Sequence, residues 1–168
     1  MMAPSISRRV AMAGGLAFGA SAVASVVQAQ SKADVRRLLI DLPGWEAPPA
    51  SATNAVAELM FQREYTRDTS TVLVTFEISL LSEPTAYAAL ADHAPDQKPW
   101  KGVIDGFTVQ RVHVADDDSG AIAVTLTDGR RRPSAFLLEY ESLSPDEALD
   151  IARQFDWLAM RQAVSNAR

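Results

Sequence analysis

The chain has 168 residues and a formal net charge of −5, with 21 acidic and 16 basic side chains and no cysteine. The lack of cysteine excludes disulfide bonds, thiolate nucleophiles and cysteine-ligated clusters, and the acidic balance disfavours nucleic acid as a partner because like charges repel. The fold must therefore be held by its own apolar core.

The first 29 residues have the features of an export signal. Arg8 and Arg9 precede an apolar stretch, 10–27, that is rich in Ala and Gly, and the residues around Gln28 predict cleavage after Ala29. A pair of arginines after a serine is typical of the twin-arginine signal, which a receptor reads as an address. An uncleaved anchor is the alternative, because these 18 residues approach the length of a membrane span. Cleavage is favoured, and it predicts a periplasmic domain at 30–168 with no stable membrane insertion.

The first half of this domain shows one helix pattern and two strand patterns. A short helix is predicted at 31–42, ended by Pro43-Gly44, and the proline-rich stretch 46–55 is predicted to be a loop. Apolar side chains then alternate with polar ones in two segments, 56–67 and 71–81, which a short turn separates. This pattern predicts an antiparallel hairpin.

The second half contains a short helix, three strands and a closing helix. The helix is predicted at 82–94 and is followed by a loop that carries Trp100. Turn-rich segments separate three strand candidates, at 103–115, 120–129 and 134–142. The final helix, 144–164, begins with a capping box in which Ser144 is the cap and Glu147 lies three residues later.

The predicted order α-β-β-α-β-β-β-α indicates an α+β domain with a five-stranded, mainly antiparallel sheet and its helices packed on one face. This order, together with the motif Leu42-Pro43-Gly44-Trp45 and the amphipathic closing helix, resembles the small α+β folds of the PsbP and Mog1 proteins. The resemblance implies an architecture only, and it assigns no functional residue.

Several chemistries lack their motifs in this sequence. The acidic turn at 116–118 does not have the alternating spacing of an EF-hand calcium loop. The two histidines, His93 and His113, are 20 residues apart, so only folding could assemble a metal site from them. Nucleophile elbows, phosphate-binding glycine loops and dinucleotide fingerprints do not occur. We therefore predict no metal and no cofactor.

The sheet face opposite the helices is the candidate ligand site. We expect it to carry a mixture of polar and apolar side chains, namely Leu73, Thr75, Glu77, Ala123, Thr125, Leu137 and Glu139. Arg63, Arg111 and His113 could join them, depending on the register of the strands, with Trp100 in a covering loop. A solvated face with ordinary Arg–Glu pairs is the alternative. The candidate binding residues are thus Arg63, Glu77, Trp100, Arg111, His113 and Glu139.

Two functional hypotheses remain. The first is a non-catalytic periplasmic accessory or binding protein, whose partner is an unknown protein or small ligand. The second is a small hydrolase or lyase in which His113 works with Glu77 or Glu139 as an acid–base pair. The position of His113 relative to these carboxylates discriminates between them.

Overall fold

A computed structural model describes residues 35–55, 58–79, 84, 86–128 and 132–166. The predicted export signal and the division of the chain at residue 29 lie outside these residues. Within them, no helix is both long enough and apolar enough to cross a membrane.

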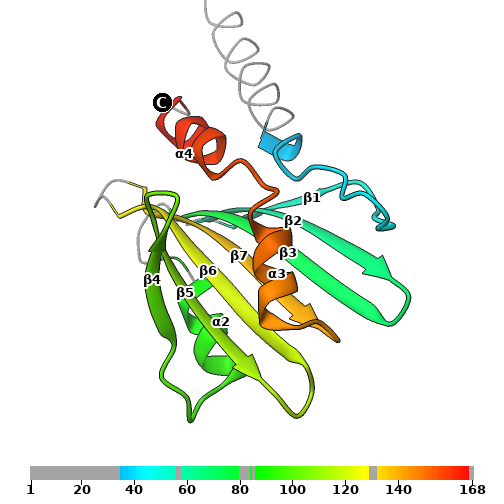
Figure 1. The fold of residues 1–168 in the computed structure, drawn as a ribbon. Coiled ribbons are helices and arrows are strands. Elements are labelled where there is room, and N and C mark those ends of the chain that lie inside the picture. The colour runs from blue at the N-terminus through cyan, green and yellow to red at the C-terminus, as the bar shows by residue number, and fades with distance from the viewer. Residues whose placement is uncertain (1–34, 56–57, 80–83, 85, 129–131, 167–168) are drawn as a thin grey trace, which may run out of the picture.

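One antiparallel sheet of seven strands forms the centre of the molecule (Figure 1). Its strand order is β1-β2-β3-β7-β6-β5-β4, and every neighbouring pair is antiparallel. The α+β class is confirmed, but the predicted number of five strands is wrong. The strands are β1 (Ser51–Ala55), β2 (Glu58–Arg67), β3 (Ser70–Ser79), β4 (Trp100–Ile104), β5 (Phe107–Val114), β6 (Ser119–Thr127) and β7 (Ser134–Glu141).

The two additional strands lie at the two edges of the sheet. At one edge, Asp105 and Gly106 have φ angles of 51° and 82°, so both occupy the left-handed region that a tight two-residue hairpin turn requires. This turn divides the predicted strand 103–115 between β4 and β5, and β4 begins at Trp100, so the prediction that Trp100 lies in a loop is wrong. At the other edge, part of the predicted proline-rich loop pairs with β2 as β1.

Apart from the two helical residues Val35 and Arg36, the structure describes three helices. They are α2 (Ala86–His93), α3 (Pro145–Ala152) and α4 (Trp157–Asn166). The Oγ of Ser144 accepts a hydrogen bond from the Glu147 N–H at 3.2 Å, which confirms the predicted cap of α3. The predicted closing helix is nevertheless two helices. Asp156 begins the second one, because its carboxylate accepts the N–H of Ala159 at 2.8 Å. The predicted first helix is helical only at Val35 and Arg36 within the described chain.

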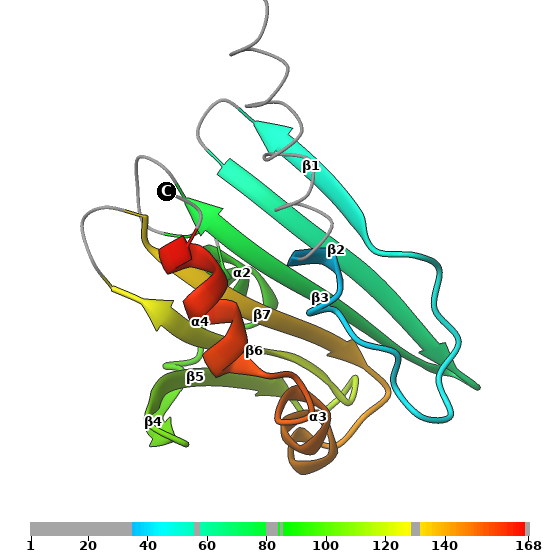
Figure 2. The same ribbon diagram turned by 90° about the horizontal axis from the view of Figure 1, so that it is seen from above.

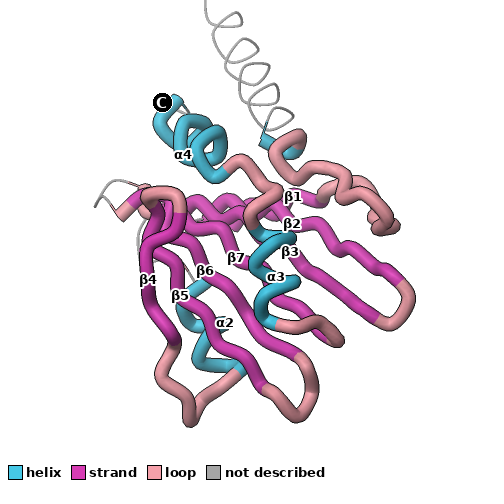
Figure 3. Tube along the Cα trace, in the orientation of Figure 1, coloured by secondary structure: helices cyan, strands magenta, loops and turns pink. Residues whose placement is uncertain are grey.

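The helices cover both faces of the sheet, and the prediction of one covered face is wrong. Figures 1 and 2 show α3 and α4 on one face and α2 on the other. The face under α3 and α4 carries the aromatic core, which includes Phe76, Phe136, Phe155 and Trp157. The face under α2 is lined by Ala121, Ala123, Ala135 and Leu137. Three of these four side chains are alanines, and they leave room for α2 to pack on β6, β5 and β7; Figure 3 shows the helix behind these strands.

Candidate functional site

The six candidate binding residues divide between the two faces of the sheet. Side chains alternate along a strand, and directly paired residues of neighbouring strands point to the same face. Glu77 and Glu139 lie on the face that α2 covers. Arg63, Trp100, Arg111 and His113 lie on the face of α3 and α4, as their contacts below establish. The expected single site is therefore two separate sets of residues.

Glu77 is 1% exposed and holds the beginning of α2. Its Oε2 accepts the backbone N–H of Ala86, the first residue of that helix, at 3.1 Å. A carboxylate at this position also meets the positive end of the helix dipole. Glu77 thus fixes the helix to the sheet.

Glu139 holds the other end of the same helix. Its Oε1 lies 3.1 Å from Nε2 of His93, the last residue of α2, and both side chains are half-buried. Between these two ends, the Tyr87 hydroxyl contacts the Thr125 hydroxyl. The face that we expected to be open therefore serves as the docking site of α2.

Arg63 binds the segment that leads into the domain. Its Nε donates to the Pro48 carbonyl at 2.9 Å, and a guanidinium nitrogen donates to the Leu39 carbonyl at 2.8 Å. The remaining nitrogen pairs with Asp41 at 2.5 Å. All of the guanidinium nitrogens thus bind residues 39–48, which leaves Arg63 a structural side chain.

Trp100 and Arg111 form a layered pair at the β4 edge of the sheet. They are direct partners in the β4–β5 ladder, and the Arg111 guanidinium lies 4.8 Å from the centre of the Trp100 ring. The indole lies over Gly102, where an added Cβ would come within 2.3 Å of the ring. Arg111 also lies 3.7 Å from Asp146 in α3. These contacts fix the orientation of the Trp100 ring, but Trp100 remains 45% exposed.

His113 follows Arg111 on the same face and packs against Tyr140. The two rings are stacked at an interplanar angle of 14°, and Nδ1 of His113 lies 3.1 Å from the Tyr140 hydroxyl. Gly120 lies between them in the register, and its missing side chain gives the room, since a Cβ there would be 2.6 Å from that hydroxyl. The partner of His113 is therefore a tyrosine and neither of the two glutamates.

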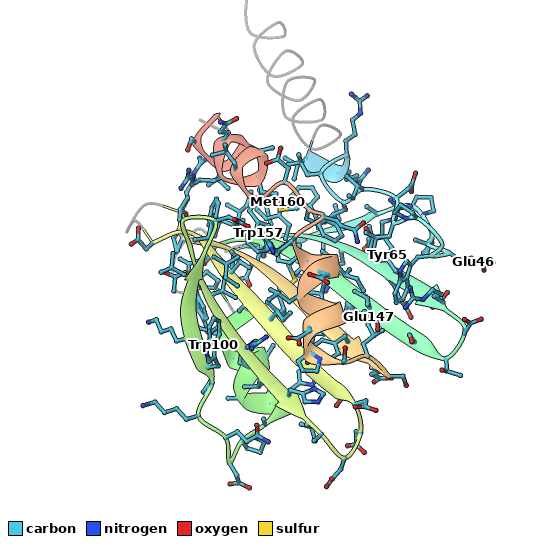
Figure 4. All side chains as sticks on the ribbon, viewed as in Figure 1. Glu46, Tyr65, Trp100, Glu147, Trp157 and Met160 are labelled. Atoms are coloured by element: carbon cyan, nitrogen blue, oxygen red, sulfur yellow. The ribbon has the colours of Figure 1, made fainter. Side chains whose placement is uncertain are left out.

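Sequence reasoning missed Gly102 and Tyr140 as members of this arrangement. The spacing Trp100-Lys101-Gly102 was a usable signal, because in a strand it places a glycine beside the indole on the same face. Nothing in the sequence indicated the pairing of Tyr140 with His113, which depends on the register of three strands. We call Trp100, Gly102, Arg111 and His113 the Trp100 surface; Figure 4 shows Trp100 beside β4 and β5, away from Tyr65.

The described part of the chain contains no group of three or more His, Asp or Glu side chains that could hold a metal ion. Comparison of the sequence and the structure with known protein families, curated proteins and solved structures gives no match. The function must therefore be argued from the geometry of the chain itself.

Proposed function

We propose that this chain is an exported, non-catalytic protein that acts in the periplasm by binding a partner protein or a small ligand through the Trp100 surface. The observation that carries the proposal is the state of Trp100, which is 45% exposed and yet fixed by Gly102 and Arg111. A large aromatic ring that is already ordered loses little conformational entropy when it is covered. Trp and Arg are also the side chains that most often dominate binding energies.

The second hypothesis, a hydrolase or lyase, has no geometric support. It requires His113 to meet Glu77 or Glu139, and these residues lie on opposite faces of the sheet. Both glutamates already bind α2, and His113 binds Tyr140. The likeness to the PsbP and Mog1 proteins remains a proposal about architecture and contributes nothing to the function.

The proposal is tested with Trp100→Ser and with a matched control, Leu158→Ser, which removes another exposed apolar side chain from a different element, α4. Each tagged protein is incubated with the periplasmic fraction of its own host, and the retained components are identified by mass spectrometry and then purified. We expect a component that binds the wild type and the control, and whose dissociation constant rises at least about tenfold with Trp100→Ser. Equal binding by all three proteins, or no retained component, would contradict the proposal.

A further inference from the structure

We infer that two copies of this chain pair through the free edge of β4, antiparallel and centred on Gly102, so that their two sheets become one. This inference concerns self-association and goes beyond the proposed function. Within the part of the chain that the structure describes, the strand order leaves β4 with a neighbour on one side only, β5 (Figures 1 and 3).

The side chains of β4 distinguish this edge from the opposite one. The exposed large hydrophobic side chains of the described chain are Trp100, Val103 and Leu158, and two of them lie on this five-residue strand. Val103 is 73% exposed. The other edge strand, β1, has the sequence SATNA and contains only small or polar side chains. The apolar exposure is thus concentrated at one edge.

Isolated proteins usually protect an edge strand with several charges, a proline inside the strand or a bulge. In β4 the only charged side chain is Lys101, and Pro99 lies before the strand rather than within it. The ladder with β5 is regular from residue 100 to residue 104. An edge that is regular, apolar and barely charged is suited to pairing with another strand.

The sequence of β4 matches itself. Two copies joined edge to edge in one sheet are related by a two-fold axis perpendicular to the sheet, so the same face of each copy lies on the same side. Because directly opposite residues point to the same face, such an axis must pass between one residue and the same residue of the second copy. Centred on Gly102, it places Trp100 opposite Ile104 and Lys101 opposite Val103 of the second copy, and it uses all five residues. Centred on Lys101, it would place two lysines opposite each other, which is unfavourable. Centred on Val103, it would leave Trp100 beyond the end of the partner strand.

The charges beside the strand support the same register. When this pairing is continued beyond the strand ends, Pro99 of one copy lies opposite Asp105 of the other. Lys98 and Asp105 then come close together at both ends of the interface. Lys98 is exposed, and the Asp105 side chain is 59% exposed even though it pairs with Arg153. Across the strands, the aliphatic part of Lys101 would cover Val103, with the ammonium group left in water. The match of charges favours a second copy over an unrelated strand.

The two indoles would lie near the axis of such a dimer. Each Trp100 ring already lies over its own Gly102, and the two glycines face each other at the centre. The rings therefore come side by side on the face of α3 and α4, within the range of aromatic pairing. The pairing thus joins the two Trp100 surfaces into one continuous region.

Sedimentation velocity over a concentration series tests the dimer. For the wild type, we expect the dimer fraction to rise with concentration. Val103→Lys places lysines opposite each other twice per dimer, so its dissociation constant should rise about tenfold or more. Val103 is mostly exposed, so this variant should keep its fold. Leu158→Lys, the matched control, should behave as the wild type. A wild type that is monomeric throughout, or a dimer that Val103→Lys does not weaken, overturns the inference.

The absence of cysteine allows a direct test of the register. Lys101→Cys and Val103→Cys are prepared separately and oxidised, alone and as a mixture. In the proposed register, positions 101 and 103 of different copies are direct partners, whereas identical positions are diagonal neighbours about 7–8 Å apart. We expect disulfide formation mainly in the mixture. Equal yields in the mixture and in the single variants would exclude the register. Because Trp100 lies in the β4 edge, a second copy of this chain that is retained in the partner test counts for the dimer only, and the proposed function requires a different component.

Discussion

Tyr65 and Tyr140 are both buried in the core of the domain. Tyr65 is fully buried and its hydroxyl donates to the Ile40 carbonyl at 2.8 Å. Burial raises the pKa of Tyr65 to about 12, an effect that the nearby Arg63 reduces and Asp41 increases. Burial likewise raises the pKa of Tyr140 to about 12, against the opposing effect of Arg111. Both hydroxyls therefore stay neutral in the folded protein at a pH where an unfolded chain would ionise.

These tyrosines predict a loss of stability at high pH. In the unfolded chain both ionise near their ordinary pKa of 10, whereas in the folded chain they ionise near 12. Because the pKa of each tyrosine is higher in the folded chain, the contribution of the two hydroxyls to the free energy of unfolding is complete below pH 10. It is lost as the pH rises from 10 to 12. We expect urea midpoints to fall through this window, together with a late rise in tyrosinate absorbance. If all three tyrosines of the folded protein titrate near 10, the assignment is wrong.

The arginines show why a residue type alone does not define a site. Arg63, Arg67 and Arg111 each lie against an aromatic ring, namely Tyr65, Trp45 and Trp100. Arg63 and Arg67 also bind groups of their own chain, through the contacts with residues 39–48 and with Glu147. Only at Arg111 is the ring itself substantially exposed. The exposure of the aromatic ring cannot be read from the sequence, and it distinguishes the proposed binding surface at Trp100 from the two structural contacts.

Helix α2 depends on the polar side chains that hold it to the sheet. It buries few large apolar groups, and the strands beneath it present mainly alanines. Replacing Glu77 by Leu keeps the approximate volume but removes the acceptor of the Ala86 N–H. We expect the free energy of unfolding to fall by about 1–3 kcal/mol, because a buried donor loses its partner.

Hydrogen exchange distinguishes a local effect on α2 from a general loss of stability. With Glu77→Leu, the amides of α2 should lose more protection than those of α3, since α3 lies on the other face. Glu64→Leu is the matched control, because it makes the same change at an exposed position of β2. Its unfolding free energy should stay within about 0.5 kcal/mol of the wild type. Equal loss of protection in both helices would show that Glu77 does not act through α2.

The strength of the local signals decided which elements could be predicted. The strands β2, β3, β6 and β7, the helix α2 and the cap at Ser144 all follow local patterns of alternation or capping. The turn at Asp105-Gly106 could have been predicted, because Asp-Gly between two apolar segments is a strong signal of a two-residue hairpin turn. The side of the sheet on which α2 packs could not be predicted, since it depends on how the chain crosses between β3 and β4. The same connection places α2 over the face that carries Glu77 and Glu139.

Long-range pairing determines when the whole molecule can fold. β7 lies at the centre of the sheet between β3 and β6, and its partners in β3, from Thr71↔Glu141 to Ile78↔Ser134, are 70 to 56 residues away along the chain. Non-local pairings of this kind form slowly, and the sheet can be completed only after β7 has been synthesised. A route that carries folded proteins, as the twin-arginine hypothesis requires, would therefore have to act after β7 has been made.

Replacement of Arg8 and Arg9 by lysine tests this route. We expect the variant to stay in the cytoplasm as an unprocessed precursor, because the receptor reads the arginine pair while the net charge is unchanged. The retained precursor should resist limited proteolysis in its domain, as a chain folded before export would. Arg36→Lys with Arg37→Lys is the matched control, since it makes the same change at the other side of the predicted cleavage site. This control should be processed like the wild type. Efficient processing of the first variant would instead indicate a route that reads only charge and hydrophobicity.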